Sequence, residues 1–350
     1  MTNPLANDLE YILENSASFW EEIRGERIFI SGATGFFGCW LLESFLWAND
    51  RLKLKSEAVI LTRDYHRFKD KAPHLAQATS VQVITGDVRS FNFPAGTFTH
   101  IIHAATDSIA WFNSNNPLLL MDTIITGTQR MLEFAGQARA KKFLLTSSGA
   151  VYGNQPVDLP RISEDYFGTP NQLDTKSTYG LAKRMAEHLC VIQREQQACE
   201  VKIARCFAFV GPYLPLDWHF AIGNFIRDGL NGGPIIIKGD GTPKRSYLYA
   251  ADLVIWLWKI LSSGKAITPY NVGSDEALSI LETADMVAKQ FEKPIKVDIL
   301  VKADPQKPAQ RYIPDISLAR NQLNLKPGIT LPDGIKRTIK YYERKNANRS

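Results

Sequence analysis

Tyr179 and Lys183 are the residues of this chain whose types and spacing point most directly to chemistry. They are four positions apart in a segment that reads as a helix, so their side chains share one face. A tyrosine phenol, with a pKa of about 10, is a poor acid or base at neutral pH. A neighbouring ammonium group favours the phenolate. The pair therefore predicts proton transfer to or from a hydroxyl group.

The position of this pair matters more than its spacing, because Tyr65–Lys69 and Tyr341–Lys345 have the same spacing and are interpreted as solvated surface. Tyr179 follows the fifth predicted strand, which carries Ser148 at its carboxyl end. Ligands of α/β proteins bind at that edge of the sheet. Ser148 is therefore predicted to hydrogen-bond the reacting hydroxyl or keto oxygen and to orient it toward Tyr179. Ser148, Tyr179 and Lys183 are the candidate catalytic residues.

A second motif is the series Gly32, Gly35 and Gly38, which follows an apolar run and opens a helical segment. Glycine is needed where the backbone turns tightly, approaches a pyrophosphate, or lets a helix pack on a strand. The helix N-terminus then offers free N–H groups to the phosphates. A strand before the glycines and a helix after them predict a dinucleotide-binding loop.

The elements that must position these residues alternate along the chain. Helical segments near 36–48, 116–138 and 178–197 separate short apolar runs. Such alternation predicts an α/β fold, a Rossmann-type doubly wound parallel sheet with helices on both faces. The runs are apolar throughout, as expected for strands covered on both faces. The six candidate strands are Arg27–Ser31, Ala58–Thr62, Val81–Thr85, His100–Ala104, Lys142–Thr146 and Val201–Cys206.

Three regions are expected. Residues 1–25 read as an amphipathic helical extension, and residues 26–206 form the dinucleotide-binding domain. After residue 206, glycine and proline become frequent and the elements less regular. This change predicts a smaller mixed α/β domain over 207–345 that mainly binds substrate, with a segment of about 245–275 returning to the Rossmann domain.

Composition narrows the class of protein. The chain of 350 residues is 45% hydrophobic and 22% charged, which is ordinary for a globular protein. Its four cysteines show no C-x-x-C pair and no zinc-ligand spacing, so we expect a reduced, cytoplasmic protein without a metal site. No export signal or bilayer-spanning run is visible, so no membrane association is expected.

The net charge of +5 does not by itself indicate nucleic acid as a partner. The basic residues are spread along the chain and are densest between Lys336 and Arg349. We interpret that cluster as a solvated helix face and a frayed tail. An anionic small molecule suits a mildly basic protein equally well.

Taken together, the ordered motifs resemble those of the extended short-chain dehydrogenase/reductases that modify nucleotide sugars. The G-x-x-G-x-x-G spacing is typical of the short-chain family, and the resemblance covers roughly residues 26–342. The motifs are the glycine loop, Gly86-Asp87-Val88, His103-Ala104-Ala105, Ser147-Ser148-Gly-Ala-Val-Tyr152-Gly153, Tyr179-x-x-x-Lys183, Arg205 with Gly211-Pro212, Gly239 to Tyr247, and Arg311-Tyr-Ile-Pro-Asp315.

This resemblance implies roles for the matching positions. Asp87 would contact the adenine, and Ala104 and Ala105 would line the ribose and pyrophosphate path. Arg245 and Arg311 resemble arginines that grip the diphosphate of a nucleotide sugar, and Thr106 is also expected to contact substrate. A homodimer is expected. The full expected cofactor-binding set is Gly32, Thr34, Gly35, Phe36, Phe37, Gly38, Arg63, Asp87, Val88, Ala104, Ala105 and Lys183.

Departures from the family pattern bear on the reaction. The 4,6-dehydratases follow the catalytic Thr with Asp-Glu, and the decarboxylases keep a Glu at the second position. Here those positions are Gly149 and Ala150, which cannot move a proton, as in the epimerases. The resemblance thus implies a 4-epimerase or 4-keto reductase acting through a 4-keto sugar. Alternatives are a dehydratase that uses a remote carboxylate, such as Asp107 or Glu164, and a non-catalytic dinucleotide-binding sensor.

The cofactor, NAD or NADP, depends on the end of the second strand. NAD enzymes of this type usually carry an Asp there that would bind the ribose hydroxyls. Aligned by the strand, Thr62 takes the acidic position and Arg63 follows, which suits a 2′-phosphate. With a shift of two residues, Asp64 restores the NAD pattern. The first alignment, and with it NADP, is the one we favour.

Overall fold

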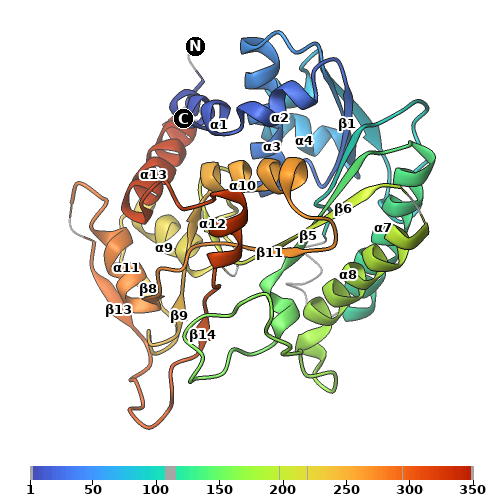
Figure 1. Cartoon of the computed structure of the whole chain (residues 1–350). Helices are drawn as coiled ribbons and strands as arrows, with labels where there is room; N and C mark the ends of the chain where they lie inside the picture. The colour runs from blue at the N-terminus through green and yellow to red at the C-terminus, as the bar shows by residue number, and fades with distance from the viewer. Residues whose placement is uncertain (1–2, 107–115, 197, 219, 294, 348–350) are drawn as a thin grey trace.

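The computed structural model describes residues 3–106, 116–196, 198–218, 220–293 and 295–347. Its centre is a seven-stranded parallel sheet with the strand order β11-β6-β5-β4-β1-β2-β3 (Figure 1). The order reverses beside β1, as in doubly wound sheets, so the predicted fold class is confirmed. The strands are β1 Arg27–Ser31, β2 Glu57–Thr62, β3 Val81–Thr85, β4 His100–His103, β5 Lys142–Ser148, β6 Glu200–Cys206 and β11 Pro269–Val272.

Apolar side chains on both faces hold the sheet between two helical layers. In β1, Ile28 and Ile30 join the core on one face, and Phe29 joins the core on the other. Successive side chains of a strand point to opposite faces, so an all-apolar strand must be covered twice. The first core includes helices α3 Phe36–Arg51 and α10 Ala250–Ser263, and the second includes α7 Pro117–Gln137 and α8 Thr178–Gln196.

The N-terminal segment is two helices, α1 Ala6–Asn15 and α2 Ala17–Glu22, instead of the single helix expected over 1–25. Buried Ser16 stands at the break between them. Both helices pack into the main core through residues such as Leu9 and Trp20. Asp8 of α1 accepts a hydrogen bond of 2.7 Å from the Tyr249 hydroxyl. The segment is therefore part of the fold's core packing.

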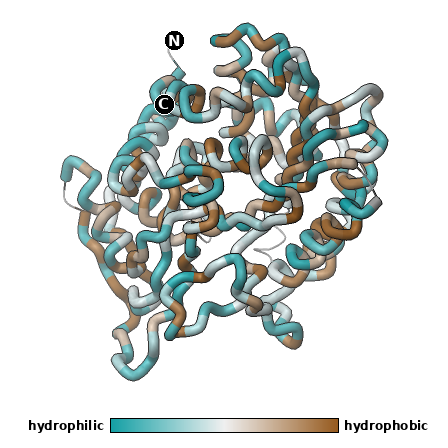
Figure 2. The backbone as a smooth tube through the Cα atoms, in the orientation of Figure 1, coloured by the Kyte–Doolittle hydropathy of each residue, from teal (hydrophilic) through white to brown (hydrophobic). Residues whose placement is uncertain are grey.

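Shorter elements after β6 build the region beyond the carboxyl ends of the strands. Three small sheets have the orders β10-β7, β12-β9-β14 and β13-β8. In Figure 2, brown hydrophobic stretches run through the central strands, whereas the outer loops are mainly teal. The strands are β7 Phe209–Val210, β8 Ile235–Ile237, β9 Lys244–Arg245, β10 Leu248–Tyr249, β12 Leu278–Ser279, β13 Val297–Ile299 and β14 Arg311–Tyr312.

Six further helices and two 3₁₀ turns are present in the described ranges. None of the helices in the described ranges is long and apolar enough to cross a bilayer. The helices are α4 Tyr65–Lys71, α5 Pro73–Ala76, α9 Ala221–Leu230, α11 Ile280–Ala288, α12 Ser317–Leu323 and α13 Leu331–Ala347, with 3₁₀ turns η1 Gly149–Tyr152 and η2 Thr175–Ser177.

The C-terminal helix α13 corrects one interpretation of the sequence. Tyr341 is half-buried, with its ring centroid 5.5 Å from that of Tyr213, and Lys345 lines a cavity at the glycine loop. The surface assignment of Tyr341–Lys345 was therefore wrong. The physical reason is that α13 folds back toward the glycine loop, a contact that the local sequence pattern does not encode.

Candidate active site

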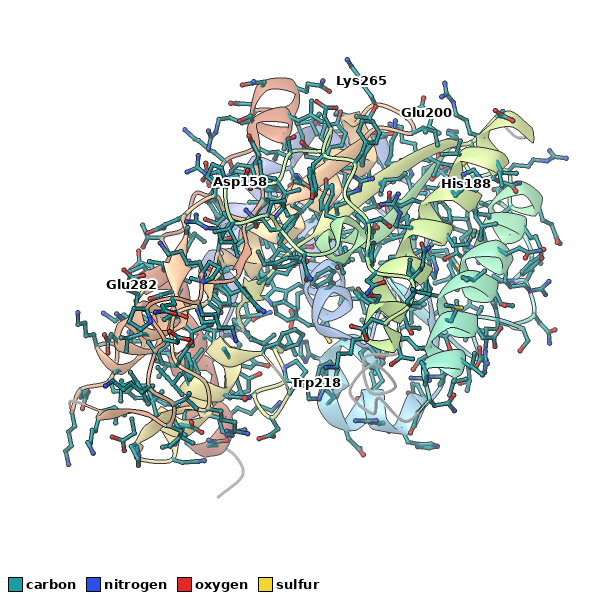
Figure 3. All side chains as sticks on the ribbon, turned by 90° about the horizontal axis from the view of Figure 1, so that it is seen from below. Asp158, His188, Glu200, Trp218, Lys265 and Glu282 are labelled. Atoms are coloured by element: carbon teal, nitrogen blue, oxygen red, sulfur yellow. The ribbon has the colours of Figure 1, made fainter. Side chains whose placement is uncertain are left out.

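A cavity of about 700 Å³ lies at the carboxyl edge of the central sheet. Its floor includes residues that follow β1, β2, β3 and β4. The adjacent strands β1 and β4 flank the point where the strand order reverses, which is where doubly wound sheets bind ligands. Residues of α9, α13 and the loop before α9 also line the cavity. Trp218, labelled in Figure 3, belongs to that loop.

The three glycines of the loop differ in the space that a side chain would have at each position. Gly32 has a positive φ of 73°, and a β-carbon there would lie 2.4 Å from the Ala104 carbonyl oxygen. At Gly38, a β-carbon would lie 2.3 Å from the Ala33 α-carbon. Gly35 is different, because a β-carbon there meets only the Gly32 carbonyl oxygen, at 3.3 Å.

Gly35 is also the N-cap of α3 and provides no side-chain cap for the helix N-terminus. The first N–H groups of a helix need partners, and the positive end of the helix dipole favours an anion. The open space at Gly35 and the uncapped helix end fit the pyrophosphate of a dinucleotide.

Most of the expected cofactor-binding residues line this one cavity. Phe37, Gly38 and Lys183 are not among the lining residues; Phe37 instead packs edge-on against Phe209, with ring centroids 5.2 Å apart. Thr106, expected to contact substrate, also lines the cavity. The expected residues that do line it are Gly32, Thr34, Gly35, Phe36, Arg63, Asp87, Val88, Ala104 and Ala105.

Sequence reasoning missed several basic side chains of this cavity. Arg67 and Lys71 come from α4, and Lys345 comes from α13. Lys71 Nζ donates a 2.7 Å hydrogen bond to the carbonyl oxygen of Thr34 in the glycine loop. The helical period of α4 offers a partial signal, since Arg67 and Lys71 are four residues apart and share a face.

The residues at the end of β2 bear on the choice between NAD and NADP. Thr62 is its last residue and pairs with Thr85 of β3. Asp64 is the N-cap of α4, and its carboxylate accepts a 2.9 Å hydrogen bond from the Arg67 backbone N–H. Asp64 therefore has a structural task in starting the helix. Arg63 lies between them and lines the cavity.

Asp87, expected beside the adenine, is bound by a neighbouring side chain. Arg89 donates to both carboxylate oxygens at 2.9 and 2.8 Å, and it also bonds Asp122 at 2.7 Å. These hydrogen bonds hold the pKa of Asp87 below its usual value. The carboxylate thus stays ionised while it faces the cavity.

The catalytic candidates come together at the end of β5. Lys183 Nζ donates a 2.9 Å hydrogen bond to the Thr146 carbonyl oxygen and lies 5.9 Å from the centre of the Tyr179 ring. Burial lowers the pKa of Lys183 to about 8. Burial also raises the pKa of Tyr179 to about 12, while a hydrogen bond with Ser148 acts in the opposite direction. The protein alone therefore keeps this phenol protonated near neutral pH.

A buried polar network behind the site fixes the strand end against α8. The Ser147 hydroxyl donates a 2.5 Å hydrogen bond to Glu187. Arg205 of β6 pairs with the same carboxylate at 2.7 Å and donates to the Tyr152 hydroxyl at 2.9 Å. Breaking such a buried pair leaves a charge uncompensated. The network therefore holds β5, β6 and α8 in one arrangement around Ser148.

The positions that carry carboxylates in the dehydratases are occupied differently here. A β-carbon at Gly149 would lie 2.6 Å from the phenol oxygen of Tyr312 and 2.7 Å from Cζ of Phe207. Tyr312, which sequence reasoning missed as a site residue, is thus inside the active site. Glu164 accepts a 2.7 Å hydrogen bond from the Asn271 backbone N–H. Asp107 lies outside the described residues.

The two arginines expected at the substrate diphosphate belong to one small sheet. In the parallel pair β14–β9, Tyr312 is opposite Arg245 and Arg311 is opposite Lys244. Among the described residues, Arg311 Nε is buried and has no hydrogen-bond partner, and the same holds for Ser246 Oγ. Buried donors normally have partners, and within the described ranges these two atoms have none.

The chain is similar to known proteins over most of its length. The model of the NAD dependent epimerase/dehydratase family matches residues 28–273. UDP-glucuronic acid decarboxylase 6 of Arabidopsis thaliana is 30% identical over 323 residues, which are 92% of this chain and 90% of that protein. UDP-glucuronic acid decarboxylase 3 of the same plant is 31% identical over 309 residues, 88% of this chain and 86% of that protein.

Solved structures share the fold. The UDP-glucuronic acid 4-epimerase of Bacillus cereus, bound to UDP-glucuronic acid and NAD, has a TM-score of 0.76 at 24% identity and covers 91% of this chain and 99% of that one. The dTDP-glucose 4,6-dehydratase DesIV of Streptomyces venezuelae has a TM-score of 0.74 at 21% identity, covering 92% and 98%. With the motifs, the glycine loop and the family match agreeing, the chain belongs to the NAD dependent epimerase/dehydratase family of enzymes.

Proposed function

We propose that this protein is a 4-epimerase or 4-keto reductase that oxidises or reduces a nucleotide-activated sugar at C4. The observation that carries the proposal is the meeting of Tyr179, Lys183 and Ser148 at the end of β5, beside the dinucleotide-type cavity. All three side chains needed for proton transfer are present, which favours an enzyme over an idle dinucleotide-binding sensor.

Each side chain has a distinct task. In the oxidative direction, Tyr179 removes the proton of the sugar hydroxyl, and in the reductive direction it returns a proton to the keto oxygen. Ser148 holds that oxygen by a hydrogen bond. Lys183 stabilises the phenolate of Tyr179 by its charge. The bound nicotinamide supplies or accepts the hydride.

NADP is the cofactor we propose, because of the charge at the end of β2. In the alignment by the strand, Thr62 takes the position of an acidic residue that would bind the ribose hydroxyls, and Asp64, which also lines the cavity, uses its carboxylate to cap α4. Arg63, Arg67 and Lys71 line the same cavity. A guanidinium fork matches phosphate oxygens, so a 2′-phosphate is favoured there.

For the substrate, we propose a nucleoside diphosphate sugar. Arg245 and Arg311 lie on neighbouring strands, and the buried donors Arg311 Nε and Ser246 Oγ have no partner within the described ranges. A diphosphate would pair with the guanidinium charges of Arg245 and Arg311. The decarboxylase relatives act on UDP-glucuronic acid by name, so UDP-sugars and UDP-glucuronic acid are the first candidates.

The test is incubation with NADP⁺ or NADPH and a panel of nucleotide sugars and their 4-keto derivatives, followed by NMR of the products. A C4-inverted sugar or a reduced 4-keto sugar is the expected product. A nucleotide pentose formed from UDP-glucuronic acid with loss of CO₂ would establish decarboxylation instead. Such a result would show that the absence of a carboxylate at Ala150 does not prevent that reaction.

We also propose a homodimer formed through α7 and α8. These helices pack side by side on one face of the sheet and expose Leu118, Met185 and Ile192. Met185 and Ile192 are seven positions apart and therefore share a face of α8. Light scattering of the wild type and of Ile192→Asp tests this, with a dimer expected for the first and a monomer for the second.

The four buried, unpaired cysteines fit an enzyme of the reducing cytoplasm.

A further inference from the structure

The end of helix α13 lines the same cavity as the glycine loop, although α13 lies in the region expected mainly to bind substrate. Its lining residues are Tyr342, Lys345 and Asn346. The second and third of these are three and four positions after the first, so all three share one face of the helix. Lys345 is half-buried. The reaction as proposed gives none of these residues a task.

Two aromatic side chains hold this end of α13 against the segment that follows β7. The rings of Tyr341 and Tyr213 have centroids 5.5 Å apart. The Tyr342 hydroxyl donates a 2.5 Å hydrogen bond to the Leu214 carbonyl oxygen. Helix ends normally fray, but the turn of α13 before Lys345 is fixed at two successive positions. The Lys345 side chain therefore starts from a defined place on the cavity wall.

Tyr213 is in turn anchored to α3, the helix whose N-terminus lines the cavity. Its hydroxyl donates a 2.6 Å hydrogen bond to Glu43 of α3, and both side chains are almost fully buried. Glu43 also accepts a hydrogen bond from Asn3 and bonds His74. Tyr213 has a positive φ of 70°, which is costly for a bulky residue and persists only where the surroundings impose it. The wall that carries Lys345 is therefore built onto α3.

Lys71 of α4 joins this wall to the glycine loop. Its ammonium donates a 2.7 Å hydrogen bond to the Thr34 carbonyl oxygen, and the same nitrogen lies 5.8 Å from the centre of the Tyr213 ring. Tyr213 therefore contacts α13 through Tyr341 and also contacts the ammonium group that is bound to the glycine loop. This chain of contacts assigns the end of α13 to the glycine-loop part of the cavity.

The lining of the cavity carries more positive than negative side chains. Like charges in one cavity repel each other, and the positive end of the α3 dipole adds to this repulsion. Asp87 is already paired with Arg89 at 2.8 Å, and Asp217 lies 3.5 Å from Arg227. A bound anion would relieve the repulsion. The basic lining residues in the described ranges are Arg63, Arg67, Lys71, Arg227 and Lys345, and the acidic ones are Asp64, Asp87 and Asp217.

We propose that Lys345 is a further cofactor-binding residue, whose ammonium pairs with the pyrophosphate of the bound dinucleotide. This inference rests on the proposed assignment of the cavity to a dinucleotide. The pyrophosphate is the group we assign, because Tyr213 and Lys71 connect the end of α13 to the glycine loop, whereas Arg63 follows the end of β2. The cofactor then bridges α3 and the end of α13, so its binding orders the C-terminal helix.

The first test is the affinity of the whole protein for NADPH and for NADH, measured without any sugar by fluorescence titration at one fixed ionic strength. Lys345→Gln should weaken both cofactors by the same factor, about tenfold or more, because both carry the same pyrophosphate. Arg344→Gln is the matched control. It removes an equal charge from the neighbouring position, which is exposed and outside the cavity lining, so both affinities should stay within about twofold.

Hydrogen–deuterium exchange of the backbone provides a second measurement. Saturation with NADP⁺ should slow exchange in residues 341–347 of the wild type, because the bound pyrophosphate holds the end of the helix. In Lys345→Gln at saturating NADP⁺ this protection should be lost, while the glycine loop, residues 32–38, stays protected.

Tyr342→Phe tests the support of Lys345. It removes the hydrogen bond to Leu214 and should weaken NADPH and NADH equally, though by less than Lys345→Gln. The double variant should lose less affinity than the product of the two separate losses, because both changes act through one contact. Thermal melts without cofactor should be alike for Lys345→Gln, Arg344→Gln and the wild type, which shows that each variant is folded.

Unchanged affinities in Lys345→Gln overturn the proposal, as does an equal loss in Arg344→Gln. A loss confined to NADPH overturns the assignment to the pyrophosphate and places Lys345 at the 2′-phosphate instead. A wild type that binds neither dinucleotide refutes the assignment of the cavity, and this inference with it. Because no sugar is present, these outcomes are independent of whether the substrate panel yields a product.

Discussion

The nitrogen of Lys183 lies 5.9 Å from the centre of the Tyr179 ring, one helical turn away, with its ammonium bonded to the carboxyl end of β5. This contact joins the two parts of the site. The helix α8 carries the proposed acid–base pair, and the hydrogen bond to Thr146 fixes Lys183 at the carboxyl end of β5. Five predictions follow from this arrangement and its surroundings, each with its own measurement.

Tyr179→Phe should abolish turnover while leaving dinucleotide affinity within a few-fold. The ring still packs against its neighbours, but no phenol remains to transfer a proton. Steady-state rates with the substrate found by the panel, and fluorescence titration with NADPH, measure the two effects. Tyr65→Phe, in the Tyr65–Lys69 pair of the same spacing, is the matched control and should retain full activity. Retained activity in Tyr179→Phe would remove this residue from the mechanism.

Lys183→Met should stabilise the protein at pH 7 while it removes activity. The pKa of Lys183 is lowered to about 8, whereas a lysine in the unfolded chain titrates at about 10.4. Between these values the unfolded state binds more protons, so the stability of the wild type rises with pH. The cost of the buried charge is thus fully present below pH 8 and fades toward pH 10.

We therefore expect Lys183→Met to gain about 1–3 kcal/mol at pH 7 and less at pH 9.5, after allowing for the lost hydrogen bond to Thr146. Denaturant unfolding at the two pH values measures this difference. Lys176→Met, at an exposed lysine of η2, is the control and should show no such pH dependence. A loss of stability in Lys183→Met that is equal at both pH values would contradict the expected charge burial.

Gly35→Val should prevent dinucleotide binding without unfolding the protein. The space at Gly35 opens to the cavity, and its backbone, with φ −76° and ψ −170°, is one that other residues adopt. Gly38→Ala should behave differently and lower the melting temperature, because its β-carbon would lie 2.3 Å from the Ala33 α-carbon. Calorimetric NADP⁺ titration and thermal melts separate the effects. Unchanged cofactor affinity in Gly35→Val would reject the pyrophosphate assignment.

Arg63→Ala should weaken NADPH far more than NADH. A charge-assisted hydrogen bond contributes about 1.5–3 kcal/mol, roughly ten- to hundredfold in affinity. Dissociation constants for both cofactors, measured side by side, give the ratio. Lys69→Ala removes an exposed positive charge from the same helix region without touching the cavity and should leave the ratio unchanged. Equal losses for both cofactors in Arg63→Ala would support the Asp64 alignment and NAD.

No 4,6-dehydratase activity is expected on any plain nucleotide hexose. Dehydration across C5–C6 needs one group to remove the C5 proton and another to protonate the leaving hydroxyl. Gly149 and Ala150 supply neither, and the phenol of Tyr312 occupies the space beside Gly149. NMR of reactions with dTDP- and UDP-glucose should show no 4-keto-6-deoxy product. Its accumulation would require a remote carboxylate, such as Glu164, to leave its bond with Asn271 and enter the site.

The sequence by itself determined the elements whose signals are local. All six expected strands are present within two residues of their predicted ends, because an apolar run between turn residues has few other stable arrangements. The glycine loop and the pair Tyr179 and Lys183 could be found because each combines a spacing along one element with a place after a predicted strand. Family resemblance added the roles of Arg245 and Arg311.

Only the tertiary structure decided which distant segments complete the site. Lys345 reaches the cavity at the glycine loop because α13 folds back across the molecule, and Tyr312 reaches Gly149 because a two-residue strand pairs with β9. Neither contact leaves a periodic pattern in the chain. In the sequence, Gly149 stands where the dehydratases carry a carboxylate. In the fold, the absence of a side chain at Gly149 leaves the space that the phenol oxygen of Tyr312 occupies. Such complementarity is a property of packing between segments, which no single segment encodes.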